Sequence, residues 1–194
     1  MTVLNMAPLK IRLAQPIQPD SIVDGEGIRT VIWTQGCSHN CLGCHNPETH
    51  SFADGFMKDI EEIKQELLKD SDQDGITLSG GDPMFQVEAC LALATYAKSI
   101  KLNVWCYTGF TFEQLLVMCE TNPNILKLLK KIDVLVDGKF QIEQKSLNLK
   151  FRGSRNQRIL NLKASLAKKK PVLLKKYRDE KVYNNQVEEK HLFL

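Results

Sequence analysis

The sequence predicts an α/β fold with a mainly parallel sheet, arranged as a partial, open β/α barrel. Short segments rich in β-branched residues alternate along the chain with segments of helical period. Glycine-rich turns or cysteines follow the ends of the predicted strands. A complete eight-unit barrel typically takes about 250 residues, whereas this chain has 194. We therefore expect fewer units and a barrel that is open on one side.

The first predicted elements lie in the N-terminal part of the chain. Residues 10–24 alternate loosely and contain two prolines, which predicts an edge strand or an extended lead-in. A turn is expected at Asp24–Gly27. The β-branched segment 28–34 predicts a buried strand. A loop containing three cysteines leaves the C-terminal end of this strand.

Helices and strands then alternate up to residue 136. Helical spacing or capping signals predict helices at residues 58–69, 84–100, 111–120 and 124–131. Strands are predicted at residues 75–79, 102–107 and 132–136. Thr111 and Gln114 form a capping-box pattern. Asn124 is expected to cap the following helix, after the break at Asn122-Pro123.

The chain is predicted to form one domain at residues 1–160, followed by a basic extension at 161–194. A length of 194 residues suits a single sizeable core, and no internal repeat or linker interrupts it. The extension has nine basic and four acidic residues and includes Lys168–Lys170, whereas the net charge of the whole chain is +3. We expect a helix and a tail in this segment.

The composition is that of a soluble globular protein, with 43% hydrophobic and 25% charged residues. No secretory signal pattern occurs in the first thirty residues, and the apolar runs are too short to cross a bilayer. We therefore expect a cytoplasmic protein without a membrane partner. A nucleic-acid partner is not expected either, because the lysine run lacks interleaved aromatic residues.

Three of the six cysteines are clustered. Cys37, Cys41 and Cys44 follow a C-x3-C-x2-C spacing, so their thiols can reach one metal centre. Three ligands leave one position open, as in metal sites that perform chemistry. The main hypothesis is a [4Fe–4S] cluster with one open iron. A structural zinc site is the alternative, although such sites usually pair two ligand dyads. Its fourth ligand would be one of three histidines: His39, His45 or His50.

A second motif, Gly80-Gly81-Asp82-Pro83, follows the predicted strand 75–79. By itself it predicts a strand-to-helix turn with proline at the helix start. Glycines also let a ligand approach the backbone, and the Asp82 carboxylate can help to hold a charged group. Tyr107–Gly109 and Asp137-Gly138 also follow predicted strands. Because the carboxyl ends of parallel strands lie on one side, we expect these motifs and the cysteine loop to converge.

The cysteine triplet together with Gly-Gly-Asp-Pro resembles the radical S-adenosylmethionine (SAM) family. Further segments are similar to the anaerobic ribonucleoside-triphosphate reductase activating proteins, which are glycyl-radical activases. This resemblance covers roughly residues 10 to 160. It rests on Asp24–Arg29, Gln35–Cys37, Cys44–Thr49, Leu78–Pro83, Tyr107–Gly109, Asp133–Gly138 and Phe151–Arg158.

The resemblance implies a radical SAM oxidoreductase with the barrel of that family. Cys37, Cys41 and Cys44 would hold a [4Fe–4S] cluster whose fourth iron binds SAM. SAM or the cluster would be contacted by Gly43, Cys44, His45, Gly80, Gly81, Asp82 and Tyr107. Reductive cleavage of SAM would generate a glycyl radical in the class III reductase, with the electron supplied by flavodoxin or ferredoxin. The alternatives are another glycyl-radical enzyme as substrate, or a non-catalytic zinc adaptor.

Three arginines and two departures from the family pattern complete the candidate residues. Arg152, Arg155 and Arg158 form a basic segment, which is most often solvated surface. Its functional interpretation is a contact with SAM or with an acidic partner surface. Glu26 stands where the family usually has proline, and His50 where an aromatic residue is common.

Overall fold

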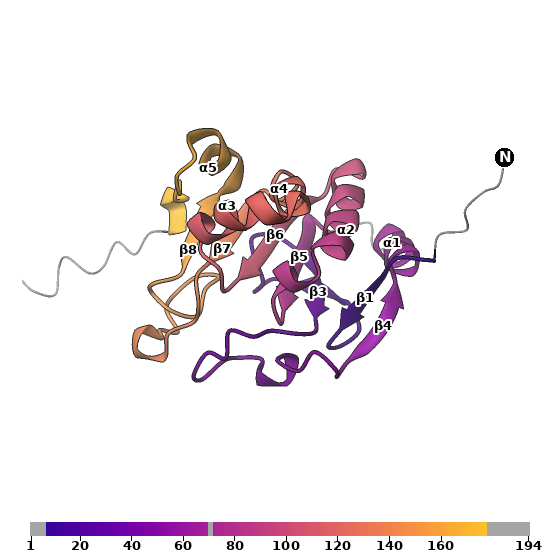
Figure 1. Cartoon of the computed structure of the whole chain (residues 1–194), viewed down its shortest axis with the longest axis horizontal. Helices are drawn as coiled ribbons and strands as arrows, with labels where there is room; N and C mark the ends of the chain where they lie inside the picture. Colours follow the sequence, from indigo (N-terminus) through magenta and orange to yellow (C-terminus); the bar gives the residue numbers. More distant parts are fainter. Residues whose placement is uncertain (1–6, 70–71, 178–194) are drawn as a thin grey trace, which may run out of the picture.

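The computed structural model describes residues 7–69 and 72–177, which form one sheet with helices packed on it. In Figure 1 the helices lie along the upper side of the sheet, and the long loops after β3 and β7 lie below it. The strands are β1 Lys10–Leu13, β2 Gln18–Ser21, β3 Arg29–Thr34, β4 Phe56–Asp59, β5 Gly75–Gly80, β6 Asn103–Thr108, β7 Val134–Asp137 and β8 Arg158–Asn161. The helices are α1 Ile60–Lys69, α2 Val87–Ser99, α3 Phe112–Thr121, α4 Pro123–Leu129 and α5 Leu162–Lys168.

The sheet is mixed, with the strand order β4-β1-β3-β5-β6-β7-β8 and with β2 paired to β3. The central strands β3, β5, β6 and β7 are parallel, as expected. The outer strands β1, β2, β4 and β8 pair antiparallel, so the expectation of a mainly parallel sheet is wrong for the margins. The physical reason lies in the connections between strands. No α-helix crosses over between β7 and β8, and a chain that returns directly along the neighbouring strand pairs with it in antiparallel orientation.

The predicted central elements are confirmed with small shifts at their ends. The capping box at the start of α3 is present, with Thr111 and Gln114 bonded reciprocally. The prediction that Asn124 caps α4 is wrong, because the side chain of Asn122 accepts the backbone N–H of Asn124 at 3.0 Å. Helix α2 begins later than predicted, since Pro83–Phe85 first form a 3-10 turn.

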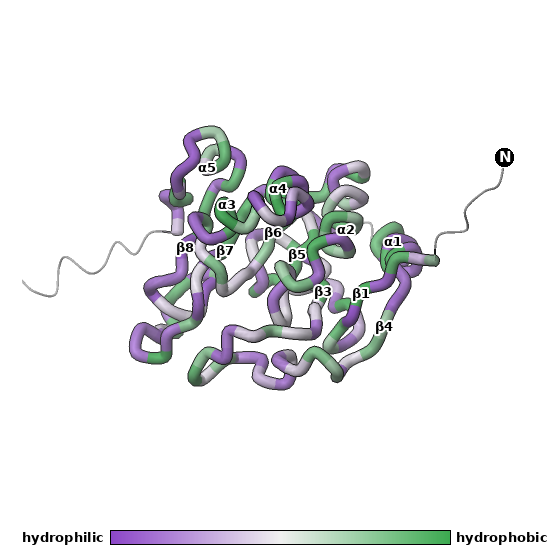
Figure 2. Tube along the Cα trace, in the orientation of Figure 1, coloured by the Kyte–Doolittle hydropathy of each residue, from purple (hydrophilic) through white to green (hydrophobic). Residues whose placement is uncertain are grey.

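Alternation along the strands gives the sheet two buried faces. The main core lies between the sheet and the helices and takes Val104, Cys106 and Leu135 from the central strands. Trp105, Val136 and Ile159 point to the opposite face and form a second, smaller cluster. Figure 2 shows hydrophobic residues along α2 and the central strands. Each fully buried large side chain contributes about 1.5–3 kcal/mol, so most of the stability resides in the main core.

The extension is described as far as Tyr177, and its predicted tail at 178–194 lies outside the described residues. Strand β8 ends at Asn161, whose side chain caps α5 by accepting the N–H of Ala164 at 2.9 Å. Leu162 is fully buried in the main core. The division at residue 160 stays a prediction. Within the described ranges, no helix is long and apolar enough to cross a membrane.

Candidate functional site

A cavity of about 400 Å³ opens where the central parallel strands end. Residues from all of the strand-end motifs line it. They are Cys37, Cys41 and Cys44 from the loop after β3, Gly80 and Gly81 after β5, Tyr107, Thr108 and Gly109 after β6, and Gly138 after β7. The convergence expected from the sequence is therefore confirmed. The 149–153 loop adds a further wall, which includes Phe151, Arg152 and Gly153.

The cysteine loop is fixed at its base by backbone hydrogen bonds. Gly36 donates to Thr49 O at 2.8 Å, and Cys37 donates to His50 O at 3.0 Å. Gln35 reinforces this closure from beneath, since its side-chain amide donates to two further carbonyl groups of the loop. Gly36 has φ +104°, a conformation that favours glycine. The loop therefore leaves β3 in a defined direction, with all three thiols partly exposed.

The chemistry of the three thiols suits an iron–sulfur cluster, because cysteine thiolates are the ligands that hold such clusters in proteins. A tetrahedral zinc ion would need its ligands to converge to roughly 2.0–2.3 Å from one point. An iron–sulfur cluster gives each thiolate its own iron and therefore spaces the ligands apart. The donor set, three thiols at one cavity, suits the cluster.

Burial affects the protonation of these thiols. It raises the pKa of Cys37 to about 11, and it also raises the pKa of Cys41 above its ordinary value. Both thiols are therefore protonated at neutral pH in the cofactor-free chain. A bound cationic centre reverses this preference, because coordination deprotonates a thiol outright. Assembly of a cluster on these cysteines would thus be accompanied by proton release from this loop.

Gly43 and His45 bring the cysteine loop against the loop that follows β7. Gly43 has φ +71°, and a Cβ there would come within 2.7 Å of Ile142. The positive φ favours glycine here, whereas the end of the Ile142 side chain could move away from a Cβ. His45 lines the cavity, and its ring centroid is 4.8 Å from that of Phe140. The two loops consequently form one continuous wall beside the thiols.

Gly80 and Gly81 allow the end of β5 to approach the cysteine loop. A Cβ on Gly80 would lie 2.5 Å from Thr34 O, and one on Gly81 would lie 2.5 Å from Gly36 O. Gly81 donates its N–H to Thr34 O at 2.7 Å. Both glycines also line the cavity. The close approach alone already requires glycine at both positions.

Asp82 lies behind the cavity wall and is 1% exposed. Its Oδ2 is 2.7 Å from His39 Nε2 and accepts the Thr108 hydroxyl and the Gly109 N–H, each at 2.9 Å. Its Oδ1 accepts the Met84 N–H at 2.9 Å. The carboxylate predicted to bind the cofactor is thus directed at four protein donors. It joins the cysteine loop to the ends of β5 and β6.

His39 is a site residue that the sequence interpretation considered only as a zinc ligand. Its side chain is 7% exposed and bonded to Asp82. The ring packs edge-on against Phe110, with centroids 4.5 Å apart. A Cβ on Gly109 would come within 2.3 Å of this ring. The signal that could have revealed His39 is its position between two cysteine ligands, combined with a buried acid in a neighbouring motif.

Tyr107 lines the cavity from β6. Burial raises the pKa of its phenol well above the ordinary value, so the group is neutral at any physiological pH. Tyr107 therefore gives the cavity a neutral aromatic wall. Such a wall can stack on a ring or donate a hydrogen bond without adding charge.

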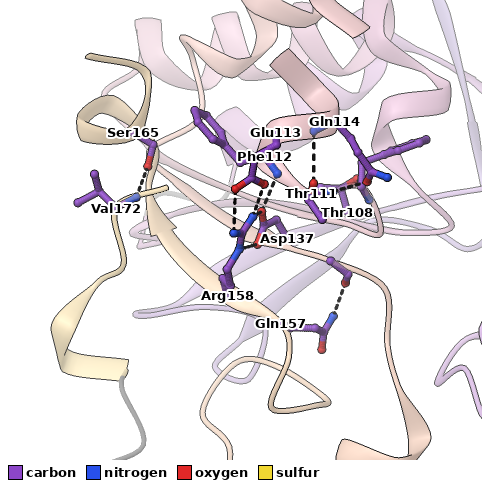
Figure 3. Close-up of polar contacts among 12 residues, drawn as sticks. Thr108, Thr111, Phe112, Glu113, Gln114, Asp137, Gln157, Arg158, Ser165 and Val172 are labelled. Carbon is purple, nitrogen blue, oxygen red and sulfur yellow. Dashed lines mark hydrogen bonds and ion pairs between the residues drawn. The ribbon is translucent and has the colours of Figure 1, made fainter. Parts of the chain in front are cut away.

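The three arginines of the basic segment have different environments. Arg152 lines the cavity and donates to Gln157 O at 2.7 Å. Arg155 does not line it, and its backbone N–H donates to Gln144 O. Arg158 points to the other side, toward the start of α3 (Figure 3). Only Arg152 is therefore placed to contact a molecule in the cavity.

Arg158 bridges two carboxylates, as Figure 3 shows. Its Nε is 2.9 Å from Asp137 Oδ1, and its Nη2 is 2.7 Å from Glu113 Oε2. Asp137 is fully buried and also accepts the Phe112 N–H at 2.7 Å. Arg158 lowers the pKa of Glu113 to about 2. These contacts give Arg158 a structural role, because a buried carboxylate requires a paired charge.

Comparison with known proteins agrees with this site. Residues 23–160 match the family model described as a 4Fe-4S single cluster domain. The match contains the cysteine triplet and every strand-end motif that lines the cavity. Fold and site thus define a protein of the single-cluster iron–sulfur class.

Individual relatives narrow this class. The anaerobic ribonucleoside-triphosphate reductase-activating protein of Vibrio cholerae is 38% identical over 147 residues, which cover 72% of this chain and 91% of the relative. Those of Pasteurella multocida and of Enterobacteria phage T4 are each 34% identical, and the matches cover 90% of both relatives and 72% and 74% of this chain. The chain belongs to the family of anaerobic ribonucleoside-triphosphate reductase-activating proteins.

Proposed function

We propose that this chain activates the anaerobic, class III ribonucleotide reductase by generating a glycyl radical in it. The observation that carries the proposal is the convergence of three partly exposed thiols and the Gly-Gly motif on one cavity. The relatives named as activating proteins are matched over nine-tenths or more of their length. The cavity at the strand ends is large enough to hold a cofactor beside the thiols.

The cysteines Cys37, Cys41 and Cys44 would hold a [4Fe–4S] cluster, with SAM bound next to it. When bound, these two groups supply one-electron reductive cleavage of SAM and a radical able to take a hydrogen atom from glycine. The backbone of Gly80 and Gly81 would hold the polar end of SAM. His45 lines the same cavity from the cysteine loop, whereas Gly43 lies outside the lining and packs against Ile142. Asp82 would act through the loop that it anchors, since its oxygens already accept four protein donors.

The remaining walls would exclude water and orient the substrate. Tyr107 provides a neutral surface, which would add no charge beside the sulfonium cation of SAM. Arg152 is the one residue of the basic segment that lines the cavity, and it could meet a carboxylate or a backbone carbonyl there. Arg155 and Arg158 lie outside the lining and would contribute to the partner surface at most indirectly.

Three finer expectations belong to this proposal. The central strands would form part of an open barrel of the radical SAM type, whose open side admits a segment of the reductase. The electron would come from a flavodoxin or a ferredoxin. The protein would work in the cytoplasm under anaerobic conditions, because a cluster with an exposed iron is sensitive to oxygen.

The test is anaerobic purification followed by reaction with the reductase. We expect about four irons and four sulfides per chain, SAM cleavage on reduction, and a glycyl-radical EPR doublet on mixing with the reductase. Cys41→Ser is the matched control and should lose the cluster and the doublet together. SAM cleavage without a doublet would refute the reductase as substrate. About one zinc and no sulfide would refute the cluster.

A further inference from the structure

The segment after α5 returns to the sheet and pairs with its edge strand. We call residues 172–177 the C-terminal strap. Leu173 bridges Leu160 of β8 in antiparallel register, and Leu174 donates its N–H to Ile159 O at 2.9 Å. Val172 donates to the buried Ser165 hydroxyl at 2.9 Å, which Figure 3 shows. These bonds fix the path of the strap, although it lies beyond residues 23–160 that match the family model.

The strap ends on the small aromatic cluster of the sheet's second face. The Tyr177 ring is 6.0 Å from Trp105 and 5.5 Å from Phe151 between centroids, both in edge-on geometry. Phe151 has φ +55°, which is uncommon for an aromatic residue and must be held by its surroundings. The Tyr177 carbonyl also accepts a hydrogen bond from Arg152 at 3.4 Å. The strap thus supports Phe151 and Arg152, which line the cavity of the three cysteines; we call this cavity the cluster cavity.

The strap also contacts the opposite wall. Lys176 forms an ion pair with Glu26 of the Asp24–Gly27 turn. The Lys176 ammonium lies over the Tyr177 ring, 5.1 Å from its centroid. One short segment therefore connects the turn before β3 to the loop that contains Phe151.

These two walls enclose an outer cavity of about 480 Å³, to which both Glu26 and Tyr177 contribute. The outer cavity and the cluster cavity share Val23, Leu149 and Phe151, so the two lie next to each other and have a common wall. Ile22 and Val23 line the outer cavity and are 70% and 71% exposed. Exposed apolar residues therefore lie at the rim of the outer cavity, which adjoins the cavity of the thiols; we call the two cavities together the passage.

We propose that the C-terminal strap sets the width of this passage, and that Tyr177 and Lys176 are positioning residues for entry of the glycine-bearing segment of the reductase. The inference rests on the proposed function, because the reductase is the partner assigned there. An extended peptide segment fits this lining, in which apolar side chains can contact its side chains while Glu26 and Lys150, of opposite charge, lie beside them. The strap holds the two walls at a fixed separation, which reduces the ordering required when the segment enters.

The test uses the full-length, cluster-loaded chain and two readouts. In steady-state activation, Tyr177→Ala should raise the KM for the reductase about 3- to 10-fold, the range expected for loss of an aromatic contact, with kcat changed less than about two-fold. Tyr177→Phe should restore the wild-type KM. Lys176→Ala should raise KM less, whereas the neighbouring Lys175→Ala is the matched control and should leave it unchanged.

The second readout needs no cofactor. In a Trp33→Phe background the remaining tryptophan is Trp105, whose emission should shift to longer wavelength in Tyr177→Ala and not in Tyr177→Phe. If Tyr177→Ala proves unstable, Tyr177→Leu retains apolar volume, and the exposed Lys176 site still tests the ion pair. An unshifted emission would show that the strap does not dock. A shifted emission with unchanged KM, or a fall in kcat at constant KM, would each overturn the role in entry.

Failure of the proposed function is recognised separately. A wild-type chain that cleaves SAM but gives no radical on the reductase would overturn that function and the entry role with it. The fluorescence comparison would still decide whether the strap docks on Trp105. A wild-type chain that activates the reductase, combined with strap variants that behave like wild type, would overturn the strap proposal alone.

Discussion

Replacing Asp82 by asparagine should destabilise the chain even without any cofactor. The substitution preserves shape but removes the charge and turns one oxygen into an NH2 group. Oδ1 accepts one buried N–H, from Met84, and Oδ2 faces three donors, those of His39, Thr108 and Gly109. Whichever way the amide is oriented, at least one donor loses its acceptor. The remaining bonds also lose the assistance of a full negative charge.

The magnitude follows from these four contacts. A buried donor left without a partner costs about 1–3 kcal/mol. Replacing a charged acceptor by a neutral one weakens each remaining bond by up to about 1 kcal/mol, and part of this loss is recovered by local adjustment. The free energy of unfolding should therefore fall by roughly 2–5 kcal/mol. For a chain of this size that corresponds to a decrease in Tm of roughly 5–15 °C.

The assay is urea unfolding of the cluster-free protein, followed by circular dichroism. Asp54→Asn is the matched control: Asp54 is an exposed acid of the loop before β4, and its substitution should change stability by less than about 0.5 kcal/mol. If Asp82 acted only by contacting SAM, Asp82→Asn would leave the cofactor-free stability within about 0.5 kcal/mol of wild type and weaken SAM binding alone. That outcome would refute the anchoring role.

Three further substitutions test other parts of the structure. Because Arg158 lowers the pKa of Glu113 to about 2, the stabilisation from this pair is complete above the ordinary carboxyl pKa and is lost as pH falls toward 2. Glu113→Gln should thus cost less than about 1 kcal/mol at pH 7, with a difference in urea unfolding that shrinks between about pH 4 and pH 2. Gly109→Ala should displace the His39 ring, since the new Cβ would lie 2.3 Å from it; we expect a loss of about 1–3 kcal/mol and a lower iron content after reconstitution. Thr111→Ala removes the cap of α3 and should cost about 1 kcal/mol in thermal unfolding, whereas an unchanged Tm would contradict the capping geometry.

The parallel centre of the sheet could be predicted because its signals are local. Strands β5 and β6 are short runs of buried β-branched or aromatic residues that end in glycine or threonine. Their carboxyl ends lie on the same side by geometry, so the positions of the motifs along the chain were sufficient to bring them together. The cavity lining follows from this arrangement and not from any single residue.

The margins of the sheet could not be predicted in the same way. Strand β4 has four residues, and Phe56 and Met57 are exposed, so its pattern resembles a loop. Its pairing with β1 joins segments more than forty residues apart and depends on the core between them. Strand β8 is equally short. A sheet edge formed by four residues carries too little periodicity to be distinguished from a turn.

The sequence also could not predict in which direction a polar side chain points. Sequence reasoning placed Asp82 at the right strand end, and the motif was consistent with a ligand contact. The structure directs its carboxylate at His39, Thr108 and Gly109, which come from two other segments. No spacing rule encodes that choice, because it depends on which donors the fold leaves unpaired. Arg158 is a second example. The sequence suggests a basic surface residue, whereas the structure pairs Arg158 with the fully buried carboxylate of Asp137, which requires a counter-charge.

The two least conventional parts of the sequence are physically connected. The family resemblance implies a proline at position 26, where this chain has a glutamate that constrains the turn less and lines the outer cavity. The extension supplies Lys176, which pairs with Glu26, and Tyr177, which holds the Phe151 loop on the other side. A proline at position 26 would have no charge to pair with Lys176, and without the extension Glu26 would lack Lys176 as its partner. The ion pair connects these two parts of the chain, so Glu26→Pro should weaken strap docking and shift Trp105 emission to longer wavelength. Measuring Trp105 emission in Glu26→Pro and in the Glu26→Pro/Lys176→Ala double variant decides this: if the two are coupled, the second substitution adds no further shift, whereas additive shifts would show that they act independently.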